Sequence, residues 1–278
     1  MEAFRKSLRG TSGLKGRMRR FEKFGVLVSG LASILILFLL APIAAIFLLA
    51  DPEVIQESLF TNAMLASEAW SALLTTLKAS ITSTLVLLAL GVPLAYVLAR
   101  KEFRGKYFIE GLLDVPLMLP HAVAGIMILT AYGRGGIFGP VTSRLGLAVD
   151  DSFWGIVAAM AFVSAPILVD TVKVGIESLD PMLELVARSL GASQAKVFTS
   201  ITLPLVARSV CVGSILSWAR AMSEVGAILI VAYYPKTVNV LVIEWFNSFG
   251  LSYAIALSIP LVLLSLCLFV VVRWVLRK

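Results

Sequence analysis

The sequence predicts an all-α fold, that of a polytopic membrane protein with six transmembrane helices. Hydrophobic residues make up 59% of its 278 residues and charged residues 15%, whereas soluble domains are about half apolar and about one quarter charged. Six apolar stretches are each long enough to cross a hydrocarbon core of about 30 Å, which needs about 20 helical residues. Basic residues gather in alternate loops, and this pattern sets the orientation of membrane helices.

The predicted organisation is a basic cytoplasmic tail at residues 1–24, followed by one transmembrane domain at 25–278. The first apolar stretch runs for about 25 residues, which is too long for the core of a signal peptide, so we expect it to remain as a span. The six spans are expected at about 25–50, 70–99, 109–132, 153–175, 204–231 and 251–274.

The distribution of basic residues predicts which loops are cytoplasmic. Of the 24 Lys and Arg residues, 18 lie in the N-terminal tail, in the loops at 100–106 and 173–200, and in the C-terminal tail. The three loops on the opposite side hold only 3. Both termini and loop 173–200 are therefore predicted to be cytoplasmic. The net charge of +7 is explained by this topology and by anionic lipid of the bilayer, so we predict no nucleic-acid partner.

Two short amphipathic helices are predicted at 181–200, in the loop between the fourth and fifth spans. Asp180 is expected to cap the first of them, and Pro181 to occupy its first position, where the missing N–H costs nothing. Gly191 suits the left-handed residue that ends a helix, and Ser193 can cap the second helix. The sequence therefore predicts two interfacial helices joined by a glycine elbow.

The first of these helices is expected to carry two different faces. Glu184 and Arg188 are four residues apart and are predicted to form an ion pair on one face. The apolar face is made of residues at helical spacing, namely Leu183, Val186, Ala187 and Leu190.

The spacing of this loop resembles the signature loop of ABC-importer permeases. In that family Glu-Ala-Ala is followed by three residues, Gly, nine residues, and then Ile-x-Leu-Pro. Gly191, Ile201, Leu203 and Pro204 match in register, but Leu185-Val186-Ala187 stands in place of Glu-Ala-Ala. The resemblance implies a type I ABC-importer permease fold and a loop that docks on a cytosolic ATPase subunit. It implies these coupling residues: Leu183, Glu184, Val186, Ala187, Arg188, Leu190 and Gly191.

A second stretch is similar to part of the oxyanion permeases. It runs from Asp114 to Gly125 and contains Pro116, Pro120 and His121. The family has the run Leu-Pro-Leu-x-Leu-Pro-Pro-x-x-x-Gly, so His121 replaces the usual second proline of the pair.

A third stretch narrows the resemblance to the molybdate/tungstate permeases, especially archaeal ones. It comprises residues 218–227 and the sequence Ala232-Tyr233-Tyr234-Pro235. The resemblance implies import of molybdate or tungstate across the cell membrane by a homodimer of the permease with two cytosolic ATPase subunits and an extracytoplasmic oxyanion-binding protein. Two alternatives stay open. One is a sulfate or other oxyanion importer of the same architecture, and the other is an ion-coupled carrier or channel that uses Arg220, Glu224, Asp170 and Lys78.

No catalytic set is visible, so we expect the chain itself not to be an enzyme. It has one histidine, His121, which excludes a histidine-rich metal site. It has no Gly-x-x-x-x-Gly-Lys phosphate loop. We therefore predict no cofactor and no metal, and we expect ATP hydrolysis in a separate subunit.

Ionisable residues inside the spans are costly and indicate functional positions by default. Arg220 and Glu224 lie deep in the fifth span, and their spacing of four residues predicts an internal ion pair on one helix face. An ion pair that only fixes helix packing explains the spacing equally well. With Pro116, Pro120 and His121, these two residues form the candidates for the translocation pathway or for packing.

Overall fold

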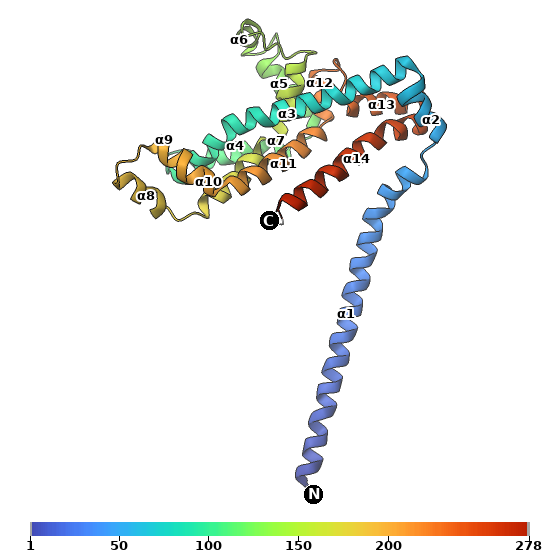
Figure 1. The fold of residues 1–278 in the computed structure, drawn as a ribbon, viewed down its shortest axis with the longest axis vertical. Helices are drawn as coiled ribbons and strands as arrows, with labels where there is room; N and C mark the ends of the chain where they lie inside the picture. The colour runs from blue at the N-terminus through green and yellow to red at the C-terminus, as the bar shows by residue number, and fades with distance from the viewer. Residues whose placement is uncertain (1, 277–278) are drawn as a thin grey trace. The chain divides into compact units, whose positions relative to one another are not determined.

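The computed structural model describes the backbone of residues 2–276 and the side chains of residues 25–267, 269 and 270. In this part of the chain every regular element is helical, as the sequence predicts (Figure 1). The chain divides into two compact units, Met1–Ala50 and Asp51–Lys278, which are described separately.

The first unit is the single helix α1 (Glu2–Leu48). Its portion Gly25–Leu48 is apolar enough to cross a membrane, and none of its described side chains is buried within the chain. The sequence analysis assigns no helix to residues 2–24, whereas α1 begins at Glu2. Extending a helix costs much less than nucleating one, so the apolar span can carry the helix into the preceding residues.

Two long helices form the frame of the second unit. The helices α3 (Ala63–Arg100) and α7 (Phe153–Glu177) pack along each other, and α11 (Ala207–Met222) packs against both. They confirm the second and fourth predicted spans as helices, although α3 begins at Ala63 instead of residue 70. The Asn62 side chain accepts from the N–H groups of Met64 and Leu65, which caps this earlier start.

The remaining elements complete the second unit at its two ends and along its flank. One end is formed by the short elements between α7 and α11, and the other by those around α2 and α13 (Figure 1). Their bounds are α2 (Pro52–Gln56), η1 (Glu57–Thr61), α4 (Lys106–Met118), α5 (His121–Tyr132), α6 (Gly139–Arg144), α8 (Met182–Ser189), α9 (Gln194–Val197), η2 (Phe198–Thr202), α10 (Leu203–Leu205), α12 (Gly226–Val231), α13 (Val238–Phe249) and α14 (Leu251–Leu276).

The third predicted span is broken into α4 and α5. The break lies at Leu119 and Pro120, where Leu119 has an extended backbone with φ −81° and ψ 144°. A proline disfavours helical geometry at the preceding residue and has no N–H to donate to the helix. The prediction of one continuous helix over 109–132 is therefore wrong.

The fifth predicted span, 204–231, is also wrong as a continuous helix. The element pair Gln194–Leu205 and Ala207–Met222 is bent by 73°. A second break at residues 223–225 separates α11 from α12. Side chains replace the lost backbone hydrogen bonds at this second break, as described below.

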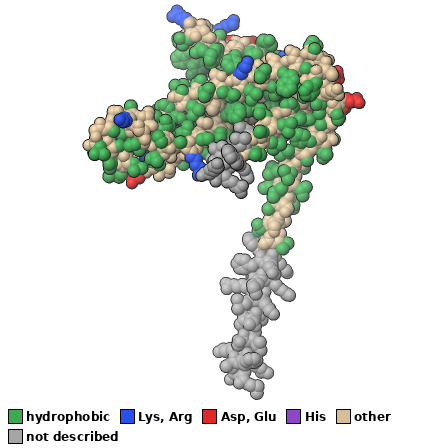
Figure 2. All heavy atoms as spheres, viewed as in Figure 1, with side chains coloured by type: hydrophobic (Ala, Val, Ile, Leu, Met, Phe, Trp, Pro, Cys, Tyr) green, Lys and Arg blue, Asp and Glu red, His purple; other side chains and the backbone are tan. Residues whose placement is uncertain are grey.

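Among the residues whose side chains the structure describes, three helices are long and apolar enough to cross a membrane, and a fourth is added if the bent pair counts as one span. Two shorter apolar helices are His121–Tyr132 and Leu251–Cys267. Hydrophobic side chains also dominate the visible surface of the second unit, where charged side chains are sparse (Figure 2). A multi-pass membrane protein follows from this surface, and six spans remain a prediction.

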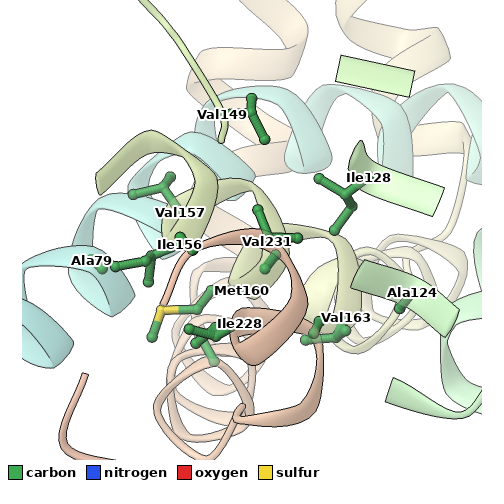
Figure 3. Close-up of a cluster of buried hydrophobic side chains, with 14 of the residues drawn as sticks. Ala79, Ala124, Ile128, Val149, Ile156, Val157, Met160, Val163, Ile228 and Val231 are labelled. Atoms are coloured by element: carbon green, nitrogen blue, oxygen red, sulfur yellow. The ribbon is translucent and has the colours of Figure 1, made fainter. Parts of the chain in front are cut away.

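The largest core cluster joins α5, α7 and α12. Met160 and Ile156 of α7 are fully buried and face Ile228 of α12 in the same cluster as Ile128 of α5 (Figure 3). This packing fixes the two short helices α5 and α12 against a long one. The breaks in the third and fifth spans are thereby held at defined positions.

Candidate functional site

The loop between α7 and α11 has the predicted pair of short helices. The first is α8 and the second α9, and Gly191 between them has the left-handed φ of +89° that the sequence predicts. Asp180 Oδ1 accepts from the N–H of Met182 at 2.9 Å, and Ser193 Oγ accepts from the N–H of Lys196 at 3.3 Å. The Ser193 cap is confirmed. Asp180 bonds the first residue of α8, but the helix begins at Met182 and not at Pro181 as predicted. A glycine elbow joins the two helices.

None of the residues of α8 is buried, and all of them except Glu184 and Ala187 are exposed. Its apolar side chains reach solvent, with Leu183 48%, Val186 53% and Leu190 84% exposed. Ala187 is half-buried and lies on the inner side. In the second unit α8 and α9 lie at one end (Figure 1). This end therefore presents an apolar surface that the rest of the unit does not cover.

Glu184 lies on the inner side of α8 and anchors it. Its Oε1 accepts from Arg100 Nε at 3.0 Å and from Thr202 Oγ1 at 2.9 Å, and its Oε2 accepts from Tyr96 Oη at 3.1 Å. The side chains of Arg100 and Glu184 are only 12% and 13% exposed. We call these four residues the Glu184 site. It joins α8 to the end of α3 and to η2.

The predicted ion pair between Glu184 and Arg188 is wrong. Arg188 is exposed, and among the described side chains no carboxylate lies within ion-pair distance of it. An exposed i,i+4 pair is worth only about 0.3–0.5 kcal/mol, whereas Arg100 gives Glu184 a partly buried, charge-assisted hydrogen bond. Glu184 therefore holds the loop in place and is not free to contact a partner protein.

Glu224 is the centre of a second site, at the break between α11 and α12. Its side chain is fully buried. Its Oε2 accepts from Arg220 NH2 at 3.0 Å and from His121 Nδ1 at 2.6 Å, and its Oε1 accepts from the N–H of Ala227 at 2.8 Å. The predicted ion pair of Arg220 and Glu224 is confirmed, but Glu224 lies beyond the end of α11 and not on a continuous helix face.

Asn239 completes this second cluster by satisfying the broken backbone. Its Nδ2 donates to the carbonyl oxygens of Met222 at 2.7 Å and Glu224 at 3.0 Å. A broken helix frees such carbonyls, and within a membrane they must find donors inside the protein. We call His121, Arg220, Glu224 and Asn239 the Glu224 site. The sequence analysis missed Asn239, which comes from a different helix, α13.

The two breaks meet at this site. His121 is the first residue of α5, and Gly226 is the first residue of α12. A Cβ atom at Gly226 would lie 2.6 Å from the Cβ of His121, so only glycine permits this approach. Pro120 precedes α5 as its N-cap residue, and Pro116 is buried within α4. Pro120 thus lies at the break between α4 and α5, and His121 contacts Glu224.

The other ionisable candidates lie elsewhere. Lys78 is exposed on α3, and Asp170 lines a groove between α7 and α11 beside Arg208. Neither contacts the Glu224 site. Among the residues that the structure describes, no three His, Cys, Asp or Glu side chains are grouped so that they could hold a metal ion.

A third polar cluster lies in the loop after α12. Lys236 Nζ is 2.7 Å from Glu68 Oε1 and 2.7 Å from Glu244 Oε2, and Tyr233 Oη donates to Glu244 at 2.9 Å. Burial alone would raise the pKa of Glu244, but its hydrogen bonds from Lys236 and Tyr233 outweigh burial and lower that pKa. Burial alone would lower the pKa of Lys236, but its two carboxylate partners raise it. The cluster ties this loop to the start of α3.

Known proteins resemble the chain over most of its length. The family described as "Binding-protein-dependent transport system inner membrane component" matches residues 91–278. The molybdate/tungstate transport system permease protein WtpB of Pyrococcus furiosus is 41% identical over 263 residues, which cover 94% of this chain and 98% of that protein. The WtpB protein of Methanocaldococcus jannaschii is 41% identical over 253 residues, covering 91% and 96%.

A solved structure resembles the fold. It is the crystal structure of a bacterial ABC transporter involved in the import of the acidic polysaccharide alginate. The TM-score is 0.69 at 18% sequence identity, and the match covers 95% of this chain and 97% of that chain. The arrangement of helices is therefore similar to that of a chain of this ABC transporter.

Proposed function

The chain belongs to the family of binding-protein-dependent transport system inner membrane components, and we propose that it imports molybdate or tungstate. It is an ABC transporter permease subunit. The WtpB relatives, named as molybdate/tungstate permeases, align with almost the whole chain at about the same identity. The match includes both the Glu184 site and the Glu224 site, because it covers 94% of the chain.

The working assembly of this proposal has several parts. Two copies of the permease form the translocation pathway, two cytosolic ATPase subunits supply the energy, and an extracytoplasmic binding protein delivers the anion. The permease itself carries out no hydrolysis. It crosses the cell membrane six times with both termini in the cytoplasm, as the asymmetry of Lys and Arg residues indicates.

The single observation that carries the proposed coupling is the exposed apolar surface of α8. Leu183, Val186 and Leu190 are exposed at the end of the unit, although apolar side chains gain about 25 cal/mol per Å² when they are buried. In the proposed complex they enter a groove of the ATPase, and Arg188 adds a charged contact at the rim. Glu184 and Ala187 face the permease and hold α8 in position.

Gly191 allows the chain to turn after the docking helix. Its φ of +89° is a conformation that side-chain-bearing residues rarely adopt. Movement of the ATPase subunits would then reach the spans through Glu184, because its partners Tyr96 and Arg100 lie on α3.

The experiment that tests the function is uptake into proteoliposomes that contain the full complex. Labelled molybdate, tungstate and sulfate are offered outside with the binding protein, and ATP is enclosed with the ATPase subunits. We expect accumulation of molybdate or tungstate only when ATP is present. Uptake of sulfate alone would overturn the substrate assignment. Flux of any anion at an equal rate without ATP would overturn the importer and leave a channel or carrier.

A further inference from the structure

One edge of the Glu224 site reaches the surface of the second unit. The side-chain exposure rises from 0% at Glu224 to 22% at Arg220 and 51% at His121. Ser223 is exposed beside them. Its Oγ accepts from Arg220 NH1 at 3.5 Å, and its hydroxyl donates to the backbone oxygen of Arg220 at 2.9 Å. The open edge therefore holds the guanidinium of Arg220 and a serine hydroxyl, and the carboxylate of Glu224 lies behind them.

Glu224 does not depend on Arg220 alone for its hydrogen bonds. When Arg220 turns away, the carboxylate keeps the contact with His121 Nδ1 at 2.6 Å and the N–H of Ala227 at 2.8 Å. A buried carboxylate without any donor would be very costly. Glu224 therefore keeps two hydrogen-bond donors when Arg220 moves away.

Arg220 is held less completely than Glu224. Besides the carboxylate, its NH2 group touches only the ring of His121, at 3.1 Å from Nδ1 and 3.4 Å from Nε2. A guanidinium presents several N–H donors in a planar fork and suits oxyanions well. Within a membrane such a group is also far from bulk water, which strengthens its attraction for an anion.

We propose that Arg220 exchanges its partner Glu224 for a tetrahedral oxyanion of two negative charges and so forms a transient anion site at the break between α11 and α12. The inference rests on the proposed function, because that function brings such an anion to these residues. The incoming oxyanion accepts hydrogen bonds from the N–H groups of Arg220 and from the hydroxyl of Ser223, which turns away from the backbone oxygen of Arg220. Glu224 remains on His121 and Ala227, and it recovers Arg220 when the anion leaves.

The competing carboxylate explains why such a site would be weak. Every anion that binds must first separate Arg220 from Glu224, and the return of Glu224 drives release. Conduction requires binding that is favourable enough for entry and weak enough for exit. Removing the negative charge of Glu224 should therefore strengthen anion binding, although it removes half of an ion pair.

The test measures binding to the purified permease–ATPase complex without the binding protein. Equilibrium dialysis with labelled molybdate and tungstate gives the Kd for the wild type and for Glu224→Gln, Arg220→Gln and Arg144→Gln. We expect Glu224→Gln to lower the Kd at least tenfold, and Arg220→Gln to abolish binding. Arg144→Gln changes an exposed arginine of α6 and serves as the matched control, with an unchanged Kd.

A gain of affinity cannot come from misfolding, so Glu224→Gln gives a clear result. An unchanged or higher Kd in a complex that melts at the wild-type temperature overturns the inference. An equal gain for chloride also overturns it, because that would indicate a bare cation and not an oxyanion site.

A second variant keeps the test independent of Glu224. Arg220→Lys keeps the charge but loses the planar fork, so we expect uptake to fall at least fivefold while the melting temperature stays close to that of the wild type. Wild-type uptake in this variant contradicts the proposal.

A failure of the anion site can be distinguished from a failure of the proposed function. If the wild type imports molybdate but these variants behave as it does, only the anion site is lost, whereas a wild type that imports no oxyanion removes the function itself.

Discussion

The Glu184 site and the Glu224 site are built on the same chemistry but serve different parts of the molecule. Each holds one glutamate against one arginine and further donors. Glu184 ties an outlying helix to a frame helix through residues that are 84 and 88 positions away. Glu224 binds an arginine four residues away and replaces backbone hydrogen bonds at a broken helix. One glutamate positions α8, which we propose to be the docking helix, and the other stabilises the break between α11 and α12.

The two sites differ in what the loss of their glutamate would disturb. In the Glu184 site all the donors are side chains, and two of them belong to α3. Its loss would free α8 but leave every helix of the frame intact. In the Glu224 site one donor is a backbone N–H of α12. Its loss would disturb the span itself.

The largest effect is expected for Glu224→Ala. This change strands Arg220 and leaves the N–H of Ala227 without its acceptor, and removing one partner of a buried ion pair costs roughly 3–5 kcal/mol. The thermal unfolding of the purified permease in detergent should shift down sharply. The double variant with Arg220→Ala should be less destabilised than Glu224→Ala alone. Strictly additive losses would show that the two residues do not couple.

The second effect concerns Glu184→Ala, which removes the anchor of α8. We expect a smaller loss of stability, roughly 1–3 kcal/mol, because the site is partly exposed and lies outside the frame. The ATPase subunit should be lost from the complex during purification, although the permease stays folded in the membrane. Arg188→Gln is the matched control on the outer side of the same helix, and it should weaken attachment only slightly. A stronger defect from Arg188→Gln than from Glu184→Ala would reverse the assignment of the two faces.

A third change tests the elbow between α8 and α9. Gly191→Val places a branched side chain at a φ of +89°, at a cost of about 1 kcal/mol or more. Because no atom lies within 4 Å of a Cβ at this position, the cost is one of conformation and not of collision. Attachment of the ATPase and anion uptake should fall together. Normal attachment and uptake with both Gly191→Val and Leu190→Glu, at wild-type membrane levels, would remove the loop from the coupling mechanism.

The smallest effect is expected at the cluster of Lys236, Glu68, Glu244 and Tyr233, which can be perturbed by a change of pH. Because the folded-state pKa of Glu244 lies below its ordinary value, its contribution to stability is present above that ordinary value and is lost as the pH falls through the folded pKa. Lys236 has a raised pKa, so its contribution is lost only as the pH rises through that raised value. The protection factors of the α13 amides, which correct for slower intrinsic exchange in acid, should therefore fall in the wild type as the pH drops below the ordinary pKa of a glutamate and through the folded pKa of Glu244, and they should change less in Lys236→Met. An equal fall in both proteins would show that this ion pair does not hold the loop.

The sequence predicts local relations in this protein well. The spacing of Arg220 and Glu224 indicates their pairing, and Gly191 indicates a left-handed elbow. Both depend on residues that are close in the chain, where the local backbone limits the distances, although Glu224 and Gly191 themselves lie beyond the ends of their helices. The long apolar runs likewise predict α3 and α7 because their length and composition admit few other structures.

Long-range relations were not accessible in the same way. Arg100 and Tyr96 are four residues apart at the end of α3, which indicates a shared polar face, but nothing in their spacing selects Glu184 as the partner. Local reasoning selected Arg188 instead, which the structure contradicts. The break after Met222 was missed because Glu224 and Asn239 replace the backbone bonds there, and the single Gly226 just after it does not by itself indicate a break.

The most direct test of the different roles of the two glutamates is the amount of ATPase subunit that co-purifies with each permease variant. Glu184→Ala and Glu224→Gln are compared in one preparation, with permease levels in the membrane measured first and Arg188→Gln as the control. We predict that Glu184→Ala loses most of the ATPase, while Glu224→Gln retains it at the wild-type ratio and changes only anion binding and uptake. Full retention of the ATPase by a folded Glu184→Ala permease would contradict the account.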